Sequence, residues 1–480
     1  MVGFAFDNSY ARLPDRFYSR IGTSPVVAPS LIALNGPLAQ ELGLNPEHLR
    51  SPAGLAVLSG SAVPDGAAPI AQVYAGHQFG GFSPQLGDGR AMLLGEVIDR
   101  HGERQDIQLK GSGRTPYSRN GDGRAWLGPV LREYLVSEAM HALGIPTTRA
   151  LAAVGTGQKV QRETALPGAV LTRVASSHIR IGSFEYFAAR RDLEALKTLT
   201  DYTLARHFPA LQDSENQALA LLAATAGAQA KLIARWLGVG FIHGVMNTDN
   251  SHVAGLTIDY GPCAFMDAYH PMQVYSAIDR QGRYAYGRQP EIMAWNLAQF
   301  ASALIPLMGA DQADAVRAAS EVLQDFPEQY HQAWLAEFRA KLGLLDKQAE
   351  DEALIHDLLR IMAVEKADFT NTFRRLGGKA AVDNFQNPAA FLEWQQRWQA
   401  RVNNQDPEQT RALITSHSPA IIPRNHRIEQ AISAAVAGDL GPFERLHAAL
   451  ASPYAPDAQY DDLRLPPEPE EIVHRTFCGT

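Results

Sequence analysis

The stretch His243-Gly-Val-Met-Asn-Thr-Asp-Asn250, with Asp259-Tyr-Gly261 following it, is the most informative part of this chain. Its amide and carboxylate oxygens are ligands that Mg²⁺ prefers, with phosphate and water oxygens completing the octahedron. The alternative is a plain turn, since such residues also bond to their own backbone. Because Asp259 stands beside a glycine at the end of an apolar segment, the pattern favours a metal site with Asn250 and Asp259 as ligands.

The spacing of this stretch matches the active-site loops of kinase-like phosphotransferases. There, His-Gly-Asp-x-x-x-x-Asn supplies a base and one Mg²⁺ ligand, and a following Asp-Phe-Gly supplies the second ligand. The pattern predicts an α+β, protein-kinase-like bilobal fold. Val245 takes the place of the catalytic aspartate, however, and it can neither accept a proton nor bind a metal. Asp249 is the remaining carboxylate of the loop, four positions too late for the usual kinase geometry. His243 is expected to be structural.

Length and composition indicate a soluble protein large enough for two lobes. The chain has 480 residues, 46% hydrophobic and 20% charged, and a chain of this size usually divides. A net charge of −8 argues against a nucleic-acid or membrane-surface binder. No apolar run approaches a membrane span and no secretory signal is apparent, so we expect a cytoplasmic protein. Two cysteines exclude a disulfide framework or a Cys-rich zinc site.

The character of the chain changes from glycine-rich and strand-like to helical. Alternation predicts strands at 91–97 and 107–110, and apolar spacing predicts a helix over 127–143 that Gly144 and Pro146 end. We expect four parts: an N-terminal extension at 1–65, a β-rich N-lobe at 66–190, a helical C-lobe with the metal and catalytic loop at 191–404, and a C-terminal helical segment with a Cys-containing tail at 405–480.

The C-lobe shows repeated 3.6-residue periodicity. It predicts helices at 218–237, 294–307, 311–342, 352–376 and 389–402, with a last helical segment at 428–450. The insert at 239–270 departs from this pattern. There, Val253, Leu256 and Ile258 around Gly255 predict a short hairpin that ends at the Asp259 motif.

Lys110 is the strongest candidate for a phosphate-binding cation. It ends a strand and precedes Gly111-Ser-Gly-Arg114, whose glycines would leave phosphates an open approach; the alternative is an ordinary solvated lysine. Glu133, on the predicted helix, resembles the glutamate that orients a strand lysine in kinases. The alternative is an exposed helical glutamate. Glu138 is a rival on the same helix, and spacing cannot choose between them.

The pattern Gly-Asp-Gly-Arg occurs twice, at 87–90 and 121–124. Such turns can present backbone N–H groups to an anion while the arginine adds a bidentate donor. Two hairpin turns are the alternative, because Asp-Gly favours turns. Arg173 and Arg180 add cations to a lobe that already holds Arg90, Arg114 and Arg124, and this local excess suggests an anionic ligand. Surface ion pairs are the alternative.

Three long strings carry a family resemblance: 74–90 (Tyr-Ala-Gly-His-Gln-Phe-Gly-Gly-Phe through Gly-Asp-Gly-Arg), 108–119 (Gln-Leu-Lys-Gly-Ser-Gly-Arg-Thr-Pro-Tyr-Ser-Arg) and 243–250. They closely resemble the selenoprotein O (YdiU) family, and the match spans nearly the whole chain. The resemblance implies a pseudokinase fold that binds ATP in an inverted pose. It implies transfer of AMP, with release of pyrophosphate, to Ser, Thr or Tyr hydroxyls of proteins.

The resemblance also implies roles for individual residues. The phosphate contacts would be Lys110, Arg173 and Arg180, with Glu133 orienting Lys110; Gly87, Gly89, Arg90, Asp122, Gly123 and Asp259 would line the nucleotide; Asn250 and Asp259 would bind the metal; and Asp249 would be the proton acceptor. It implies ATP as co-substrate, with UTP as a further donor, and Mg²⁺ or Mn²⁺ as the metal. Inversion would bring the α-phosphorus to the acceptor and make pyrophosphate the leaving group. This would explain why position 245 lacks the aspartate of a kinase.

Cys263 and Cys478 are the two cysteines of the chain. Family members tend to carry a selenocysteine or cysteine third from the end, where Cys478 stands. We hypothesise a reversible Cys263–Cys478 disulfide near the nucleotide, a redox switch; a buried Cys263 and an idle tail thiol are the alternative. Rival functions are a protein or small-molecule kinase with Asp249 as a displaced base, and a non-catalytic nucleotide-binding scaffold. We expect a monomer with protein substrates as partners.

Overall fold

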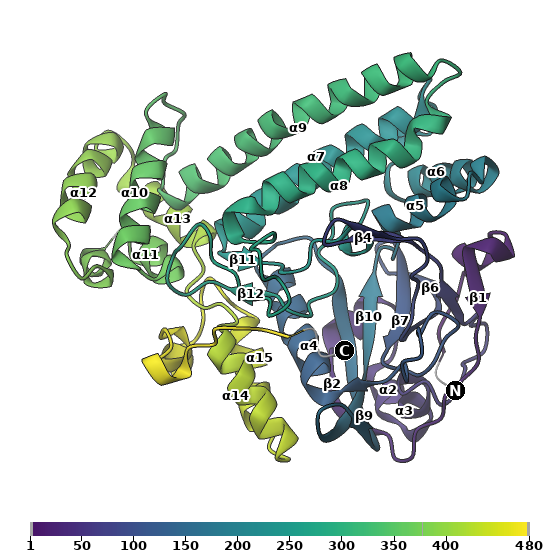
Figure 1. Ribbon diagram of the computed structural model, residues 1–480. Helices are drawn as coiled ribbons and strands as arrows, with labels where there is room; N and C mark the ends of the chain where they lie inside the picture. Colours follow the sequence, from purple (N-terminus) through teal and green to yellow (C-terminus); the bar gives the residue numbers. More distant parts are fainter. Residues whose placement is uncertain (1–2, 377, 478–480) are drawn as a thin grey trace.

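An antiparallel sheet forms the centre of one half of the molecule (Figure 1). The computed structural model describes residues 3–376 and 378–477. In these residues the sheet has eight strands, in the order β1-β3-β6-β7-β10-β9-β2, with β8 paired to β10. The strands are β1 (Tyr18–Arg20), β2 (Ser30–Leu34), β3 (Ile70–Gln72), β6 (Ala91–Ile98), β7 (Arg104–Lys110), β8 (Ala125–Trp126), β9 (Arg149–Gln161) and β10 (Ala165–Ala175). The strands predicted at 91–97 and 107–110 are confirmed.

Helices cover both faces of this sheet. Along β10, Val170 and Val174 pack with the N-terminal helices, whereas Ala169 and Leu171 pack with α4 (Leu127–Ala142), as the two-residue alternation of a strand requires. The N-terminal helices are α1 (Gly36–Glu41), α2 (Pro46–Arg50) and α3 (Pro52–Leu58). Each starts at an Asn or Ser cap followed within two residues by proline, a favourable helix start.

The predicted N-terminal extension contributes to the same sheet. β1 pairs with β3, and β2 pairs with β9. Both strands precede residue 65, so the extension is interleaved with the β-rich segment that follows it. The predicted boundary at 65 stays a prediction.

The other half of the molecule is helical. Three long helices lie together at its top in Figure 1: α7 (Gln217–Gly238), α8 (Gln289–Leu304) and α9 (Gln312–Lys341). Below them lie α5 (Ile181–Ala189) and α6 (Leu193–His207). The remaining helices are α10 (Asp351–Glu365), α11 (Phe369–Arg375), α12 (Ala389–Val402), α13 (Pro407–His417), α14 (Asn425–Val436) and α15 (Gly441–Leu450). Together with the sheet they make a mixed α+β fold.

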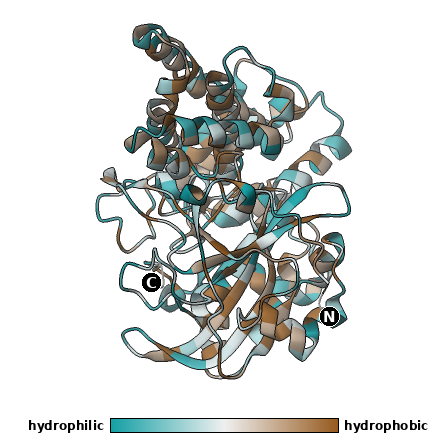
Figure 2. Ribbon diagram, turned by 90° about the vertical axis from the view of Figure 1, so that its right-hand side faces the viewer, coloured by the Kyte–Doolittle hydropathy of each residue, from teal (hydrophilic) through white to brown (hydrophobic). Residues whose placement is uncertain are grey.

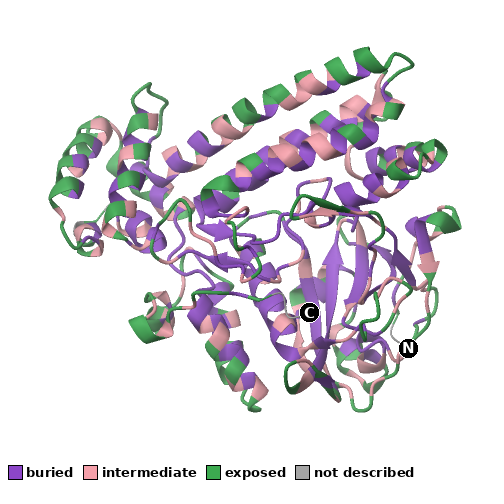
Figure 3. Ribbon diagram, viewed as in Figure 1, coloured by how far each residue is buried: buried purple, intermediate pink, exposed green. Residues whose placement is uncertain are grey.

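Burial follows this arrangement. Figure 3 shows the sheet and the inner faces of the long helices as buried, with exposed residues on the outer turns of α9 and α12. Figure 2 shows apolar residues concentrated in the strands. Among the described residues, α7 is long and apolar enough to cross a membrane by length and composition, and 56% of that apolar window is buried inside the protein. It shares the main hydrophobic core with α4 (Leu127–Ala142), as core helices do.

Three sequence predictions need correction. The helix predicted at 352–376 is two helices, because Lys366 is left-handed (φ 52°) and Asp368 caps α11. The segment 428–450 lies in two helices separated at Gly438, whose φ is 98°.

The predicted hairpin around Gly255 is also wrong. The residues from Val253 to Ile258 form turns, and the short strands β11 (Phe241–Ile242) and β12 (Ala264–Phe265) pair instead. Val253 and Ile258 are both fully buried, which fits their apolar side chains. Apolar alternation alone cannot distinguish such a buried loop from a strand.

Candidate functional site

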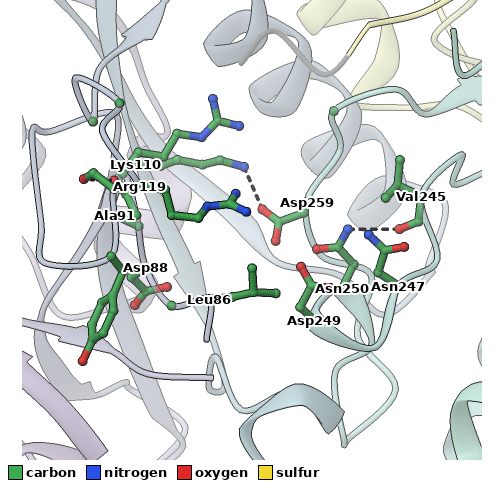
Figure 4. Close-up of a pocket in the computed structure, with 18 of the residues that line it drawn as sticks. Leu86, Asp88, Ala91, Lys110, Arg119, Val245, Asn247, Asp249, Asn250 and Asp259 are labelled. Carbon is green, nitrogen blue, oxygen red and sulfur yellow. Dashed lines mark hydrogen bonds and ion pairs between the residues drawn. The ribbon is translucent and has the colours of Figure 1, made fainter. Parts of the chain in front are cut away.

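A cavity of about 620 Å³ opens between the sheet and the loop that follows β11 (Figure 4). The predicted residues that line it are Gly87, Gly89, Arg90, Lys110, Asp122, Gly123, Arg173, Arg180, Asp249, Asn250 and Asp259. Val245 lines it as well. Glu133 lies behind Lys110, beside a smaller recess. The structure therefore gathers residues from distant parts of the chain around one space.

A buried ionic cluster forms one wall of the cavity. Lys110 Nζ lies 2.6 Å from Glu133 Oε2 and 2.7 Å from Asp259 Oδ1. Arg173 Nη2 lies 2.6 Å from Glu133 Oε1 and 2.5 Å from Asp259 Oδ1. Arg173 pairs with Gln108 across the β7–β10 ladder, so Arg173 and Lys110 point to the same face. Two strands and one helix thus fix the positions of the cations.

The cluster keeps its carboxylates charged. Burial raises the pKa of Asp259, but Arg173, Lys110 and Arg180 together hold that pKa well below its ordinary value. The pKa of Glu133 is lowered by Arg173 and Lys110 against the same effect of burial. The three cations are therefore balanced by carboxylates in this state.

The rival glutamate points elsewhere. Glu138 accepts hydrogen bonds from Arg149 Nε at 2.9 Å and Nη2 at 2.8 Å, and from the Ala150 N–H. Of the two glutamates, Glu133 is the one that contacts Lys110. The geometry thus distinguishes two residues that spacing could not.

The loop between β11 and β12 presents the oxygen atoms. Asp259 adopts a left-handed backbone (φ 64°), a conformation that non-glycine residues rarely hold and that clusters at functional sites. His243 braces this loop: its Nε2 bonds the Ile258 carbonyl at 2.9 Å, and its Nδ1 accepts from the Val245 N–H at 3.4 Å. Both ring nitrogens are occupied by backbone, which fits the structural role expected for this histidine.

Asp249 is a buried carboxylate at the wall of the cavity. Burial raises its pKa to about 6. Its Oδ2 accepts a hydrogen bond from Gln78 Nε2 at 3.1 Å, whereas its buried Oδ1 has no hydrogen-bond partner among the described residues. Gly76 packs so closely that a Cβ there would lie 2.7 Å from Oδ1. Asp249 therefore lines the cavity as a carboxylate with a raised pKa, and its Oδ1 is shielded by Gly76.

Asn250 and Asp259, the predicted metal ligands, line the same cavity as Asp249. Asn250 donates its Nδ2 to the Val245 carbonyl at 3.0 Å, which leaves its Oδ1 to point elsewhere. Figure 4 shows Asp249, Asn250 and Asp259 on one side of the cavity. The described residues hold no cluster of three or more His, Cys, Asp or Glu side chains that would suit a metal. One carboxylate, Asp259, and one amide, Asn250, fit a hard divalent cation that takes its other ligands from phosphates and water.

The two Gly-Asp-Gly-Arg segments differ in structure. Asp88 is buried and accepts from the Gln72 N–H at 3.0 Å, whereas Asp122 pairs with Arg162 at 2.9 Å. A Cβ at Gly123 would collide with the Gly113 carbonyl. In both segments the carboxylates are engaged by the protein itself. Arg114, one of the arginines counted toward a basic lobe, does not line the cavity.

Sequence reasoning missed part of the site. Tyr74, Gln78, Phe79, Tyr117, Arg119 and Asn247 also line the cavity. Tyr74 lies under Arg180, with the guanidinium carbon 4.3 Å from the ring centre. Several of these residues stand inside the strings that carry the family resemblance, but a lone Tyr or Gln gives no chemical signal of its own.

The structure describes one of the two cysteines. Cys263 is buried beside the cavity-lining Pro262, and its Sγ lies 3.4 Å from the Tyr260 carbonyl oxygen. Cys478 lies outside the described residues. The disulfide between them stays a prediction.

Comparison with known proteins places the chain in a family. The family model described as Protein adenylyltransferase SelO matches residues 1–451. The chain is 59% identical to the protein nucleotidyltransferase YdiU of Ruegeria pomeroyi over 480 residues, 58% identical to that of Bradyrhizobium sp. (strain ORS 278) over 489 residues, and 55% identical to that of Geobacillus kaustophilus over 487 residues. Each alignment covers all of both proteins. The chain therefore belongs to the SelO (YdiU) family of protein nucleotidyltransferases.

Proposed function

We propose that this cavity transfers AMP from ATP to a hydroxyl group of a protein and releases pyrophosphate. The observation that carries the proposal is one cavity that holds both the Asp249 carboxylate, whose pKa burial raises to about 6, and the cations Lys110, Arg173 and Arg180. Membership of the adenylyltransferase family supports the choice of AMP over phosphate.

The step divides into a proton transfer and a displacement. The Asp249 carboxylate takes the proton of a Ser, Thr or Tyr hydroxyl, and the hydroxyl oxygen forms a bond to the α-phosphorus. The bond from that phosphorus to the bridging oxygen of the β-phosphate breaks, and the electron pair leaves with pyrophosphate. Lys110, Arg173 and Arg180 stabilise the charge on the departing group.

The position of Val245 explains why the base has moved. Its side chain is apolar and lines the cavity, and in the sequence pattern it stands at the position of the kinase aspartate. An acceptor hydroxyl at that place would meet no base. Asp249 lies four residues later in the loop than Val245. With the base at Asp249, the acceptor hydroxyl would attack the α-phosphorus of ATP instead of the γ-phosphorus, as expected if ATP binds in the inverted pose.

The metal would be held by Asn250 and Asp259, with Mg²⁺ or Mn²⁺ as candidates. A bound divalent cation would neutralise negative charge on the phosphate oxygens. Asp259 Oδ1 already lies within 2.7 Å of Lys110 and 2.5 Å of Arg173. Binding of the metal would therefore replace these contacts of Asp259, and Lys110 and Arg173 would then hydrogen-bond to the phosphates. UTP remains a candidate second donor.

The arrangement of halves supports a kinase-like bilobal frame. The sheet and the helical half lie next to each other in Figure 1, and the cavity is lined by residues of the sheet and of the loops at 245–278. We propose the N-lobe at 66–190 and the C-lobe at 191–404, with protein acceptors as partners and a cytoplasmic monomer as the working form.

Labelling with radioactive ATP tests the proposal. Wild-type protein incubated with ATP labelled at the α-phosphate should label protein, including itself, and ATP labelled at the γ-phosphate should not. The variant Asp249→Asn should lose labelling and still bind ATP. The matched control is Asp325→Asn, an exposed carboxylate on α9. Labelling from the γ-phosphate would indicate a kinase, and ATP binding without any labelling would indicate a scaffold.

A further inference from the structure

A short hairpin lies directly on the catalytic loop. It consists of β4 (Gly76–Gln78) and β5 (Gly81–Ser83), joined by Phe79 and Gly80 with φ angles of 52° and 85°. Positive φ at both turn residues indicates a type I′ turn, the tight turn that suits the twist of two strands.

The hairpin is bonded to three consecutive residues of the loop. The His77 N–H donates to Thr248 Oγ1 at 2.7 Å, and the Phe79 N–H donates to Asn247 Oδ1 at 3.1 Å. Gln78 Nε2 donates to Asp249 Oδ2 at 3.1 Å. Anything that binds to the hairpin is therefore held at a fixed position relative to the base.

The outer edge of the hairpin is available for pairing. In a two-residue hairpin the pair next to the turn, Gln78 and Gly81, exchanges hydrogen bonds, so the following pair, His77 and Phe82, points its N–H and C=O groups outward. On the β4 side the outward His77 N–H meets the catalytic loop. On the β5 side Gly81 and Phe82 are exposed. An extended chain could hydrogen-bond to this edge.

Three large apolar side chains are exposed in the hairpin or at the cavity. Phe79 is 39% exposed, Phe82 43% and Ile278 56%. Phe79 and Ile278 line the cavity, and Phe82 stands against His77 in the hairpin, with 4.9 Å between ring centres. Clustered exposed apolar side chains on a soluble protein commonly mark a surface that binds a partner.

A cation completes this surface. Arg283 lies near Gly80 at the turn, with its guanidinium carbon 4.8 Å from the ring centre of Trp295. Its buried Nε has no hydrogen-bond partner, and no carboxylate within the described ranges forms an ion pair with it. Arg119, which is exposed, points into the cavity (Figure 4). In a chain with net charge −8, this local positive charge complements an acidic partner.

We propose that the β4–β5 hairpin, together with Ile278 and Arg283, is the docking surface for the acceptor protein, which binds as an extended segment. The inference rests on the proposed function, because the segment must bring its hydroxyl to Asp249. Its backbone pairs with the outer edge at Phe82. A large apolar residue near the hydroxyl packs on Phe79, Phe82 and Ile278, and an acidic residue meets Arg283.

Peptide selectivity tests this assignment even when the natural acceptors are unidentified. The probe is a positional-scanning library of peptides with one fixed Ser, Thr or Tyr, incubated with ATP labelled at the α-phosphate. Wild type should select Phe, Leu or Ile near the hydroxyl and Asp or Glu at a second position. Arg283→Glu should reverse the second preference toward Lys or Arg, a change that loss of folding cannot produce.

A second variant measures the apolar contact. Phe82→Ser should raise the KM for the selected peptide roughly three- to tenfold, because a bound peptide can newly bury only the exposed 43% of this side chain. It should leave the Kd for ATP unchanged. The matched control is Val364→Ser, an exposed apolar residue on α10 that is 73% accessible. It should change neither value.

The outcomes separate this inference from the proposed function. Unaltered selectivity in Arg283→Glu together with an unaltered KM in Phe82→Ser would overturn the docking surface. Self-labelling by wild type without any labelled peptide would also overturn it, because the acceptor would then not be an extended segment. If nothing is labelled from the α-phosphate, including the protein itself, the proposed function fails.

Discussion

Replacing Glu133 by Gln removes the charge that Lys110 and Arg173 share. Glu133 is buried and accepts one hydrogen bond from Lys110 and two from Arg173, at 2.6, 2.8 and 2.6 Å. If the amide oxygen of Gln faces Arg173, its NH₂ group faces Lys110. If the amide is turned the other way, Lys110 meets an uncharged oxygen. Lys110 then has Asp259 as its remaining carboxylate partner, so it is drawn toward the proposed metal ligand.

The magnitude follows from the number of bonds lost. A hydrogen bond between charged groups contributes about 1.5–3 kcal/mol. If alignment of Lys110 with the phosphates depends on one such bond, kcat/KM for AMP transfer should fall roughly 10- to 150-fold, at about 1.4 kcal/mol per factor of ten. Unfolding should become easier by about 2–4 kcal/mol, slightly less than the cost of breaking a whole buried pair.

Glu138 provides the matched control. It stands on the same helix and makes a comparable pair with Arg149, plus a bond from the Ala150 N–H. Glu138→Gln should therefore lose similar stability but keep full transfer per folded molecule. The assays are α-phosphate labelling, ATP titration by calorimetry and urea unfolding for both variants. A Glu133→Gln enzyme within threefold of wild type, or equal losses of activity in both variants, would refute the reasoning.

Three further expectations concern other parts of the molecule. Asp259→Ala should abolish labelling, as a chelator should in wild type. In this variant the affinity for ATP should no longer depend on divalent cations. Unchanged labelling would refute the metal assignment. Burial lowers the pKa of Lys341 from 10.5 to about 7, so the unfolded chain binds more protons between these values and folding stability rises with pH across them. Urea unfolding should show this rise in wild type and not in Lys341→Met, and parallel curves would contradict it. Peptide masses before and after reduction should reveal a Cys263–Cys478 link in oxidised protein, and separate peptides would end that hypothesis.

Some elements could be predicted because their cause is local. Strands β6 and β7 follow from alternation, and the helix at 127–142 follows from apolar spacing closed by Gly144. The helices at 352–376 and 428–450 were placed correctly but not divided, since one left-handed residue such as Lys366 breaks a helix without disturbing its periodicity. The false hairpin near Gly255 has a related cause: burial inside the fold imitates the apolar alternation of a strand.

The candidate site divides in the same way. The order of oxygen-bearing residues in the loop 243–261 and the missing aspartate at Val245 belong to the sequence, because metal and proton chemistry depend on residue type and spacing. The choice of Glu133 over Glu138 does not. Residues five apart on a helix point about 140° away from each other, and only packing decides which of them faces β7.

The state of Asp249 is likewise a product of the tertiary structure. Its pKa of about 6 comes from burial beneath a hairpin that is distant in sequence, and its free oxygen depends on where Gln78 lies. The sequence by itself determined which chemical groups the site contains and which one it lacks. The tertiary structure decided which of them share a cavity, which are neutralised by partners and which stay reactive, because charge and burial depend on distances between residues far apart in the chain.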